Sequence, residues 1–398
     1  MRHFTALIGA AALIAQAGLT AQGPRRPVRM RGETSVASRL TDSTRAVLTR
    51  ALSDGAFPGA VAVIGNHVGI LASYGVGRLD AADSTRPSVT TMYDLASLTK
   101  IVATTSLMLQ LVDQGRIALD TQVVRYLPEW HGPRASEITI GQLLTHSSGL
   151  GSWRAFYKEA TDKADARSQL MLVGPDAPPG SRFVYSDMNF MLLGMVAEKL
   201  TGMTLDSAFL AMVATPLKLV DTRFVPDSSQ RSRIAPTEYD PWRQRQLRGE
   251  VHDENASRFG GVSGHAGLFA TAADLSRVAR MWLNGGTLDG ARIASAKTVA
   301  TFTRVQDTLI SRRALGWETP NGTNSAGHRL SPRAFGHTGF TGTSMWIDPS
   351  RDLFIILLTN RVNPTRENKK IGGVRIALAD AIVGAIDGGS ARSAAPTP

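Results

Sequence analysis

Residues 93–100 of the chain read Tyr93-Asp94-Leu95-Ala96-Ser97-Leu98-Thr99-Lys100. Apolar residues then recur at helical spacing as far as Leu111, which predicts a helix that begins near Ser97 and ends near Gly115. Residues three positions apart share one face of a helix, so the Ser97 hydroxyl and the Lys100 amine can meet. A serine hydroxyl needs a base beside it to act as a nucleophile, and a lysine is a base only where its pKa is lowered. The same spacing also arises by chance, as a surface serine beside a solvated lysine, so other parts of the chain must distinguish the two interpretations.

The composition of the 398-residue chain is typical of a soluble globular protein, with 43% hydrophobic and 19% charged residues. Its 44 Lys and Arg residues against 33 Asp and Glu give a net charge of +11, which suits an anionic cell envelope. The basic residues are spread along the chain and form no block with interleaved aromatics, so we expect no nucleic-acid partner. The absence of cysteine excludes disulfides, a thiol nucleophile and a cysteine-based metal site, and we expect neither a metal nor a cofactor.

The start of the chain has the pattern of an export signal. Arg2-His3 precedes an apolar run from Ala6 to Ala15, and Ala15-Gln16-Ala17 fits a cleavage site. The apolar run is too short to span a membrane, and no other run is long enough. We therefore expect residues 1–21 to be a signal peptide, residues 22–40 to be a Pro- and Arg-rich tail, and the mature protein to be periplasmic or secreted without a transmembrane segment.

Strand patterns occupy both ends of the remaining chain, and helical patterns fill the middle. The expected strands are Ala60–Ile64, Val68–Val76, Thr341–Ile347 and Leu353–Leu358, and the clearest helices are Thr41–Asp54, Thr139–Leu144, Asn189–Leu200, Thr271–Trp282 and Lys370–Ile386. We predict an α+β fold in which the N- and C-terminal segments pair in one antiparallel sheet flanked by helices, with a large helical insert between them.

The expected domains follow from this organisation. Residues 41–95 and 311–387 are predicted to form the sheet domain, residues 96–310 a mostly helical domain, and residues 388–398 a disordered tail. Ser97 then lies at the boundary between the two domains, where pockets tend to form.

Three short elements occur in a characteristic order: Ser97-Leu98-Thr99-Lys100, Tyr185-Ser186-Asp187 and His337-Thr338-Gly339. With the supporting stretches 143–150 and 260–268, the chain resembles the serine β-lactamase and penicillin-binding superfamily, nearest to class C β-lactamases and their esterase and peptidase relatives. The resemblance covers about residues 40–385. It implies a β-lactamase/transpeptidase-like fold and an exported serine hydrolase that forms an acyl-enzyme.

The resemblance also implies roles for these residues. Ser97 would attack a carbonyl, with either Lys100 or Tyr185 as the base. The oxyanion would bind the backbone N–H groups of Ser97 and Phe340. Asp187, His337, Thr338 and Gly339 would line the substrate side, and the missing side chain of Gly339 would let substrate lie against the strand.

Two positions depart from the usual pattern of the superfamily. Asp187 stands where an Asn is common; a carboxylate only accepts hydrogen bonds, so it would stabilise a charged Lys100 and favour Tyr185 as the base. Asn189, two residues on, could partly compensate for the lost amide. His337 stands where a Lys is common, so a permanent charge becomes a partial one, which favours neutral esters and amides over carboxylate-bearing substrates.

Other polar residues in glycine-flanked loops are interpreted as structural, notably His146 and His265. The run His252-Asp253-Glu254 lacks a second histidine at helical spacing, so it is interpreted as a loop rather than a metal site. This run resembles a stretch in family members linked to muropeptide processing.

The sequence therefore predicts a serine hydrolase that cleaves an amide or ester, with a peptidoglycan-derived peptide or a β-lactam as the first substrate class. D-alanyl-D-alanine carboxypeptidase, β-lactamase and muropeptide amidase activities all fit this prediction. A carboxylesterase on the same scaffold is the alternative enzyme, and a non-catalytic penicillin-binding or wall-ligand sensor is the alternative of another class. An ordinary α/β-hydrolase is disfavoured because no Gly-x-Ser-x-Gly occurs in the chain. The sequence does not predict the oligomeric state.

Overall fold

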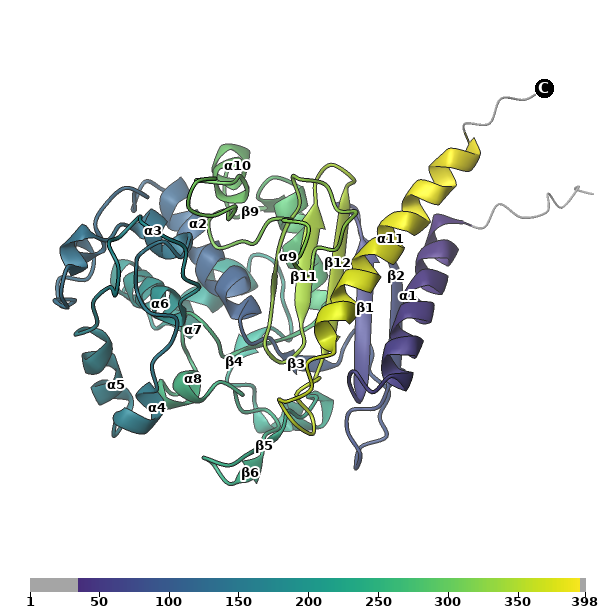
Figure 1. Ribbon diagram of the computed structural model, residues 1–398, viewed down its shortest axis with the longest axis horizontal. Helices are drawn as coiled ribbons and strands as arrows, with labels where there is room; N and C mark the ends of the chain where they lie inside the picture. Colours follow the sequence, from purple (N-terminus) through teal and green to yellow (C-terminus); the bar gives the residue numbers. More distant parts are fainter. Residues whose placement is uncertain (1–34, 394–398) are drawn as a thin grey trace, which may run out of the picture. The chain divides into compact units, whose positions relative to one another are not determined.

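The computed structural model describes residues 35–393, with side chains described to residue 388. Segments from the two ends of this range pair in one five-stranded antiparallel sheet with the order β10-β11-β12-β1-β2 (Figure 1). Its strands are β1 Gly59–Gly65, β2 Ile70–Gly77, β10 Phe335–Thr338, β11 Ser344–Asp348 and β12 Leu353–Thr359. The pairing of β1 with β12 joins the N- and C-terminal segments, which confirms the predicted α+β architecture.

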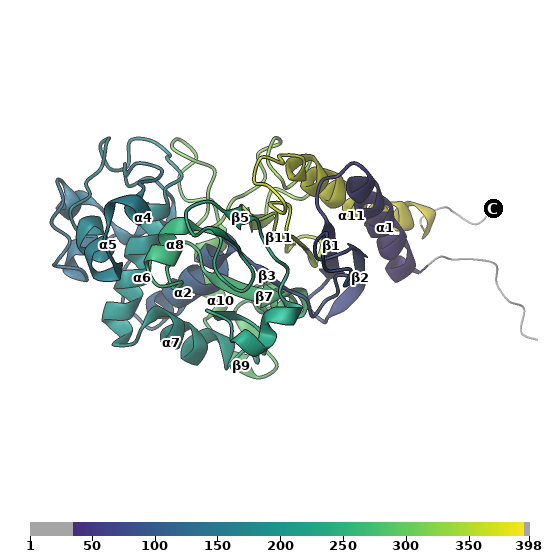
Figure 2. The ribbon, with the colours of Figure 1, turned by 90° about the horizontal axis from the view of Figure 1, so that it is seen from below.

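Helices cover both faces of this sheet. On one face α1 (Val36–Ser53) and α11 (Ile371–Ser393) lie side by side, as both views show (Figures 1 and 2). On the other face α9 (Ala272–Leu283) contacts β1, β11 and β12. Every residue of β1 is buried as a result, which explains its continuous apolar sequence in place of an alternating one.

The middle of the chain forms the predicted helical region. It contains α2 Thr105–Asp113, α3 Ile140–Leu144, α4 Phe156–Glu159, α5 Lys163–Leu170, α6 Asp187–Thr201, α7 Leu205–Phe209, α8 Glu254–Arg258 and α10 Ala296–Thr303. A small sheet, β3 Met92–Asp94, β7 Leu268–Thr271 and β4 Arg223–Phe224, and the hairpins β5 Tyr239–Asp240 with β6 Arg245–Gln246 and β8 Thr287–Leu288 with β9 Ala291–Arg292 complete it. Among the described helices, none is long and apolar enough to cross a membrane.

Local sequence signals account for several helix ends. Thr271 caps α9 by accepting a hydrogen bond from the Asp274 N–H, as the spacing of the two residues predicts. Thr139 caps α3 with a complete capping box that includes Gln142. Gly202 ends α6 in the left-handed region at φ 71°, where a residue without a Cβ is favoured.

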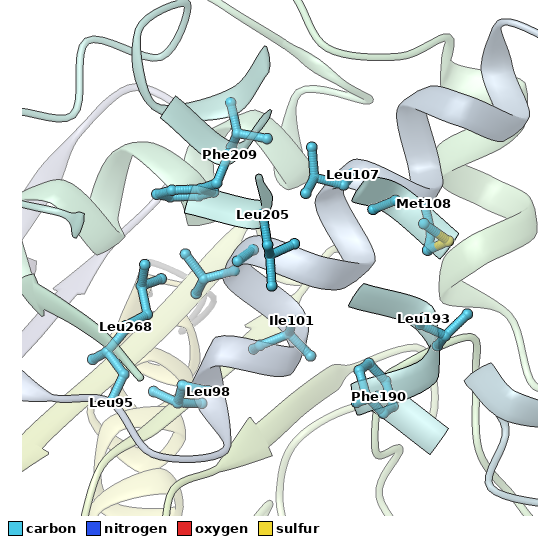
Figure 3. Close-up of a cluster of buried hydrophobic side chains, with 14 of the residues drawn as sticks. Leu95, Leu98, Ile101, Leu107, Met108, Phe190, Leu193, Leu205, Phe209 and Leu268 are labelled. Atoms are coloured by element: carbon cyan, nitrogen blue, oxygen red, sulfur yellow. The ribbon is translucent and has the colours of Figure 1, made fainter. Parts of the chain in front are cut away.

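The segment around Ser97 is held by a buried apolar cluster (Figure 3). Leu95, Leu98 and Ile101 are fully buried and pack with Phe190 of α6 and Leu268 of β7. Burying one such side chain stabilises the fold by roughly 1.5–3 kcal/mol. The backbone that carries Ser97 and Lys100 is therefore held in place by the core.

The helix expected to begin near Ser97 does begin at Leu98, and it passes through a π-helical turn over Lys100–Thr104 before α2 starts at Thr105. Two other expected boundaries were wrong. Residues 36–40, expected to belong to the N-terminal tail over 22–40, are the first residues of α1, because Leu40 is buried against the sheet. Residues 388–393, expected to belong to the C-terminal tail, are the last residues of α11, because a helix once formed extends at little cost per residue.

The expected division into a sheet domain and a helical domain stays a prediction. The described residues from Val36 onward form one compact unit, and their largest buried cluster includes Val61 and Leu358 as well as Phe190. The expected signal peptide over residues 1–21 lies outside the described residues.

Candidate active site

Ser97 lies on a tight turn between β3 and the π-helical turn. Ala96, directly before it, has φ +46°, an uncommon conformation for a residue with a side chain. Asp94 supports this turn, because its Oδ1 accepts from the Ala96 N–H at 2.8 Å and its carbonyl accepts from Thr341 Oγ1 at 2.7 Å. Strained backbone and π-helical turns both recur at functional sites.

Lys100 is fully buried, and its ammonium group has three close partners. Nζ lies 2.9 Å from Ser97 Oγ, 2.8 Å from Asp187 Oδ1 and 3.0 Å from the carbonyl oxygen of His265. Burial by itself lowers the pKa of Lys100, but the attraction of Asp187 and Tyr185 outweighs burial, so the pKa is raised above its ordinary value. Lys100 is therefore a charged ammonium group, and the lowered pKa that a lysine base requires is not met.

Tyr185 lies beside both Lys100 and Ser97. Its hydroxyl interacts with Lys100 and Ser97, and its ring lies between His146 and His337 at centroid distances of 4.5 and 5.9 Å. Burial raises the pKa of Tyr185, and the charge of Lys100 opposes this only in part. The resting site thus contains a protonated phenol beside a protonated amine.

His146 supports Tyr185 from behind, in keeping with the structural interpretation of this residue. Its Nδ1 accepts from the Ser186 N–H at 3.0 Å and lies 3.1 Å from Asn189 Nδ2. Burial, followed by the neighbouring cations, lowers the pKa of His146 well below its usual range, so the ring is neutral. The other end of the Asn189 amide, its Oδ1 atom, accepts a hydrogen bond from Ser148 Oγ at 2.6 Å. The expectation that Asn189 compensates for Asp187 was therefore wrong, because its amide faces the core.

His337 lies on β10 with its side chain buried. Burial, followed by the charges of Arg313 and Lys100, lowers the pKa of His337 well below its usual range. The expected partial charge at neutral pH was wrong, because a desolvated imidazole among cations stays neutral. Positive charge comes instead from Arg361 and Arg375; burial lowers the pKa of Arg375 to about 10, which leaves it charged at pH 7.

A cavity of about 370 Å³ brings most of the predicted site residues together. Its walls are formed by Ser97, Tyr185, Glu318, His337, Thr338, Gly339, Phe340, Arg361 and Arg375. Lys100 and Asp187 lie behind Ser97 and Tyr185. A larger groove of about 560 Å³ runs between α1 and α11, but its largely apolar walls hold no nucleophile beside a base.

The N–H groups expected to bind the oxyanion lie on the Ser97 turn and on the turn after β10. Among the described residues, neither the Ser97 N–H nor the Phe340 N–H donates a hydrogen bond within the protein. A Cβ on Gly339 would lie 2.1 Å from Thr343 Oγ1 and 2.4 Å from the Leu95 carbonyl. Glycine is therefore required here for close packing of the turn against the nucleophile segment, in addition to the expected access for substrate.

Sequence reasoning missed the contribution of Asp253 and His265. His265 Nε2 lies 2.9 Å from Asp253 Oδ1, and its Nδ1 lies 2.8 Å from Ser263 Oγ. Ligand atoms of Asp187, Asp253 and His265 lie within 4.8 Å of one another, a spacing that could hold a metal ion. The Lys100 ammonium group already contacts this cluster and provides its positive charge. The glycine-rich stretch 260–268 was the available signal, but sequence spacing alone does not bring it to Lys100.

The site combines a serine in contact with a buried lysine, next to an antiparallel sheet and a helical region. This combination defines a serine hydrolase of the β-lactamase/transpeptidase type. A family model described as Beta-lactamase matches residues 44–379. The chain belongs to the beta-lactamase family.

Relatives with curated names support this assignment. An N-acetylmuramyl-L-alanine amidase of Bacillus subtilis (strain 168) is 35% identical over 343 residues, which cover 77% of each chain. A protein of Escherichia coli (strain K12), whose name carries a provisional D-alanyl-D-alanine carboxypeptidase assignment, is 33% identical over 302 residues, covering 68% of this chain and 69% of that protein.

Solved structures show the same fold. A penicillin-binding protein homologue from Caulobacter crescentus superposes with a TM-score of 0.71 at 21% identity, covering 87% of this chain and 97% of the other. A family VIII carboxylesterase superposes with a TM-score of 0.69 at 24% identity, also covering 87% and 97%.

Proposed function

We propose that the protein is an exported hydrolase that cleaves an amide bond in a carboxylate-bearing, cell-wall-derived peptide through a Ser97 acyl-enzyme. The observation that carries this proposal is the contact of 2.9 Å between Lys100 Nζ and Ser97 Oγ, with Tyr185 beside both. The export signal pattern at the N-terminus and the wall-directed names of the relatives support the location.

The charges of the site assign the proton transfers. Lys100 keeps its proton, so the Ser97 proton passes to the oxygen of Tyr185, which acts in its minor phenolate form. The attack of Ser97 Oγ on the carbonyl forms a tetrahedral oxyanion, and the N–H groups of Ser97 and Phe340 would receive it. Tyr185 then returns the proton to the leaving amine, and water releases the acyl group by the reverse order of steps.

The two arginines of the cavity favour a substrate with a carboxylate. Neutral His337 offers no charge, whereas Arg361 and Arg375 line the same cavity as Ser97. Arg375 Nη2 donates to the carbonyls of Gly339 and Thr343, both at 2.8 Å, so the guanidinium is fixed beneath the turn. Its field would attract an anionic end of a peptide.

A carboxylesterase is the second candidate. It is favoured by the neutral His337 and by the acceptor-only Asp187, which would bind a substrate amide carbonyl poorly. A non-catalytic sensor is the third, and measurable turnover would exclude it.

The test is a direct comparison of substrates with the mature protein. A peptide ending in D-Ala-D-Ala, an N-acetylmuramyl peptide and a neutral p-nitrophenyl ester are each incubated with wild type and Ser97→Ala, and the products are identified by mass. We expect one of the two peptides to be cleaved with a higher kcat/KM than the ester, and we expect this cleavage to require Ser97. Cleavage of the ester alone would establish the esterase, and no Ser97-dependent cleavage or adduct would overturn the hydrolase.

A further inference from the structure

We propose that Trp153, Tyr157 and Trp242, here called the aromatic wall, form a saccharide-binding subsite beside Ser97. The preferred substrate would then carry a pyranose ring next to the bond that is cleaved. This inference rests on the proposed function, because it extends the substrate of the same site.

The aromatic wall is built from two separate parts of the chain. The ring of Tyr157 lies 6.2 Å from that of Trp153 and 5.1 Å from that of Trp242, measured between centroids. Buried Asn255 of α8 holds the first part, because it accepts from the Tyr157 N–H at 3.0 Å and donates to the Arg154 carbonyl at 2.8 Å. The neighbouring helices α4 and α8 lie side by side in both views (Figures 1 and 2).

Backbone contacts place the wall at the edge of the active site. The backbone carbonyl of Ser152, directly before Trp153, accepts a hydrogen bond from the Asp187 N–H at 3.1 Å. The Asp187 carboxylate in turn contacts Lys100. At the other end, Arg243, directly after Trp242, donates to the His252 carbonyl at 2.9 Å.

The His252 end leads back to the reacting centre. The His252 ring stacks on Phe340 with centroids 5.5 Å apart, and Phe340 lines the cavity that contains Ser97. The chain segments that carry the wall are therefore joined to the active site at two points, at Asp187 through Ser152 and at Phe340 through Arg243 and His252.

The chemistry of the wall suits a sugar. Trp153 is 49% exposed and Trp242 is 38% exposed, so both present ring surface to solvent. Arg243 and Arg258 stack on Trp242 at 5.6 and 5.3 Å, and Arg258 also donates to the Tyr157 carbonyl at 3.0 Å. A pyranose places its C–H face on an aromatic ring and its hydroxyl groups on the polar rim.

Two further points favour this occupant over an apolar one. Cationic groups of Arg243 and Arg258 lie over the Trp242 ring and that of Lys158 lies over the Tyr157 ring, so the surface offers hydrogen-bond donors beside its aromatic rings. The Bacillus subtilis relative is named for a bond between N-acetylmuramic acid and L-alanine, and a substrate of that kind carries a sugar next to the bond that is cleaved.

Binding without turnover gives the first test. The Ser97→Ala protein is titrated with N-acetylmuramyl-L-alanyl-D-isoglutamine and with D-lactoyl-L-alanyl-D-isoglutamine, which differs only by lacking the sugar, and Kd is measured by calorimetry. We expect the sugar-bearing probe to bind about tenfold more tightly, the effect of one good aromatic contact. Equal affinity for the two probes, or no binding of either, would overturn the subsite.

Substitutions in the same Ser97→Ala background locate the effect. Trp242→Ala and Trp153→Ala should reduce the ratio of the two affinities toward one, and Trp242→Phe should restore part of it. Tyr74→Ala is the matched control, because Tyr74 also contacts two arginines but lies on β2, at the opposite edge of the sheet from β10. An equal loss of affinity for both probes would show a structural role for the wall and overturn the proposal.

The outcome is distinguishable from failure of the proposed function. A sugar preference in the binding assay, combined with no hydrolysis of either probe by the wild type, would leave the subsite standing and refute the amide-cleaving activity. Hydrolysis of both probes with equal kcat/KM, together with equal affinity for both, would support the amide-cleaving activity and refute the subsite.

Discussion

Lys100 Nζ and Asp187 Oδ1 lie 2.8 Å apart at a position where the lysine side chain has no exposure to solvent. An ammonium group in such a place needs a counter-charge, and Asp187 provides it. The pair raises the pKa of Lys100 in spite of its burial. The positive charge beside Ser97 is therefore permanent over the physiological pH range, and it can stabilise an anionic Tyr185.

Replacement of Ser97 tests the nucleophile. Ser97→Ala should abolish acylation by a penicillin or an activated ester and reduce turnover by at least about 10³-fold, because Lys100 and Tyr185 alone form no acyl-enzyme. Intact mass after brief exposure measures the adduct. An adduct of equal yield on the Ser97→Ala protein would place the nucleophile elsewhere.

The pH profile tests the base. Since burial raises the pKa of Tyr185 above its ordinary value of 10.0, the phenolate fraction and kcat/KM should increase with pH from 6 to 9 without a plateau. Asp187→Asn removes a charge that raises the pKa of both Tyr185 and Lys100, so the profile should move to lower pH. An unchanged profile, or a shift to higher pH, would contradict the assigned roles.

Arg375 is expected to act on substrate charge. Arg375→Gln should lower kcat/KM about tenfold for a peptide with a free C-terminal carboxylate, through loss of a nearby charge. The same peptide with an amidated C-terminus is the control and should be affected less. An equal loss for both peptides would mean that Arg375 only braces the Gly339 turn.

Asp253 is expected to contribute to stability in a pH-dependent way. Burial raises the pKa of Asp253, but His265 and the Ala256 N–H outweigh burial, so the pKa lies below the ordinary 3.8. A lowered pKa stabilises the folded state above pH 4, and this contribution declines as the pH falls further. Asp253→Asn should therefore lower the free energy of unfolding by about 2 kcal/mol at pH 7 and by less at pH 3, measured by urea unfolding. A difference that stays constant with pH would refute the ionic contribution.

Gly339 is expected to tolerate no side chain. Gly339→Ala places a Cβ 2.1 Å from Thr343 Oγ1, so it should cost about 2 kcal/mol or more and displace the Phe340 N–H, reducing activity. Gly372→Ala on α11 is the matched control, because a Cβ there meets nothing within 4 Å and alanine favours a helix. Equal thermal stability and activity of the two variants would contradict the packing argument.

Much of the fold could be predicted from local patterns. Apolar runs at Ala60–Ile64 and Leu353–Leu358 predicted the central strands, because burial on both faces requires continuous apolar sequence. The caps at Thr139 and Thr271 depend on residues three positions away, so they too can be recognised locally. The order of the Ser97, Tyr185 and His337 elements was enough to identify the family.

The state of the site depended on contacts that no local pattern contains. The charge on Lys100, the neutrality of His337 and the use of the Asn189 amide follow from burial and from partners far away along the chain, such as His265, which is 165 residues from Lys100. Asp253 and His265 meet Lys100 only because β7 pairs with β3 and draws the stretch 260–268 against the nucleophile segment. Residue types in order determine which chemistry is possible, whereas desolvation and proximity, which are properties of the folded chain, determine which groups are charged and which proton can move.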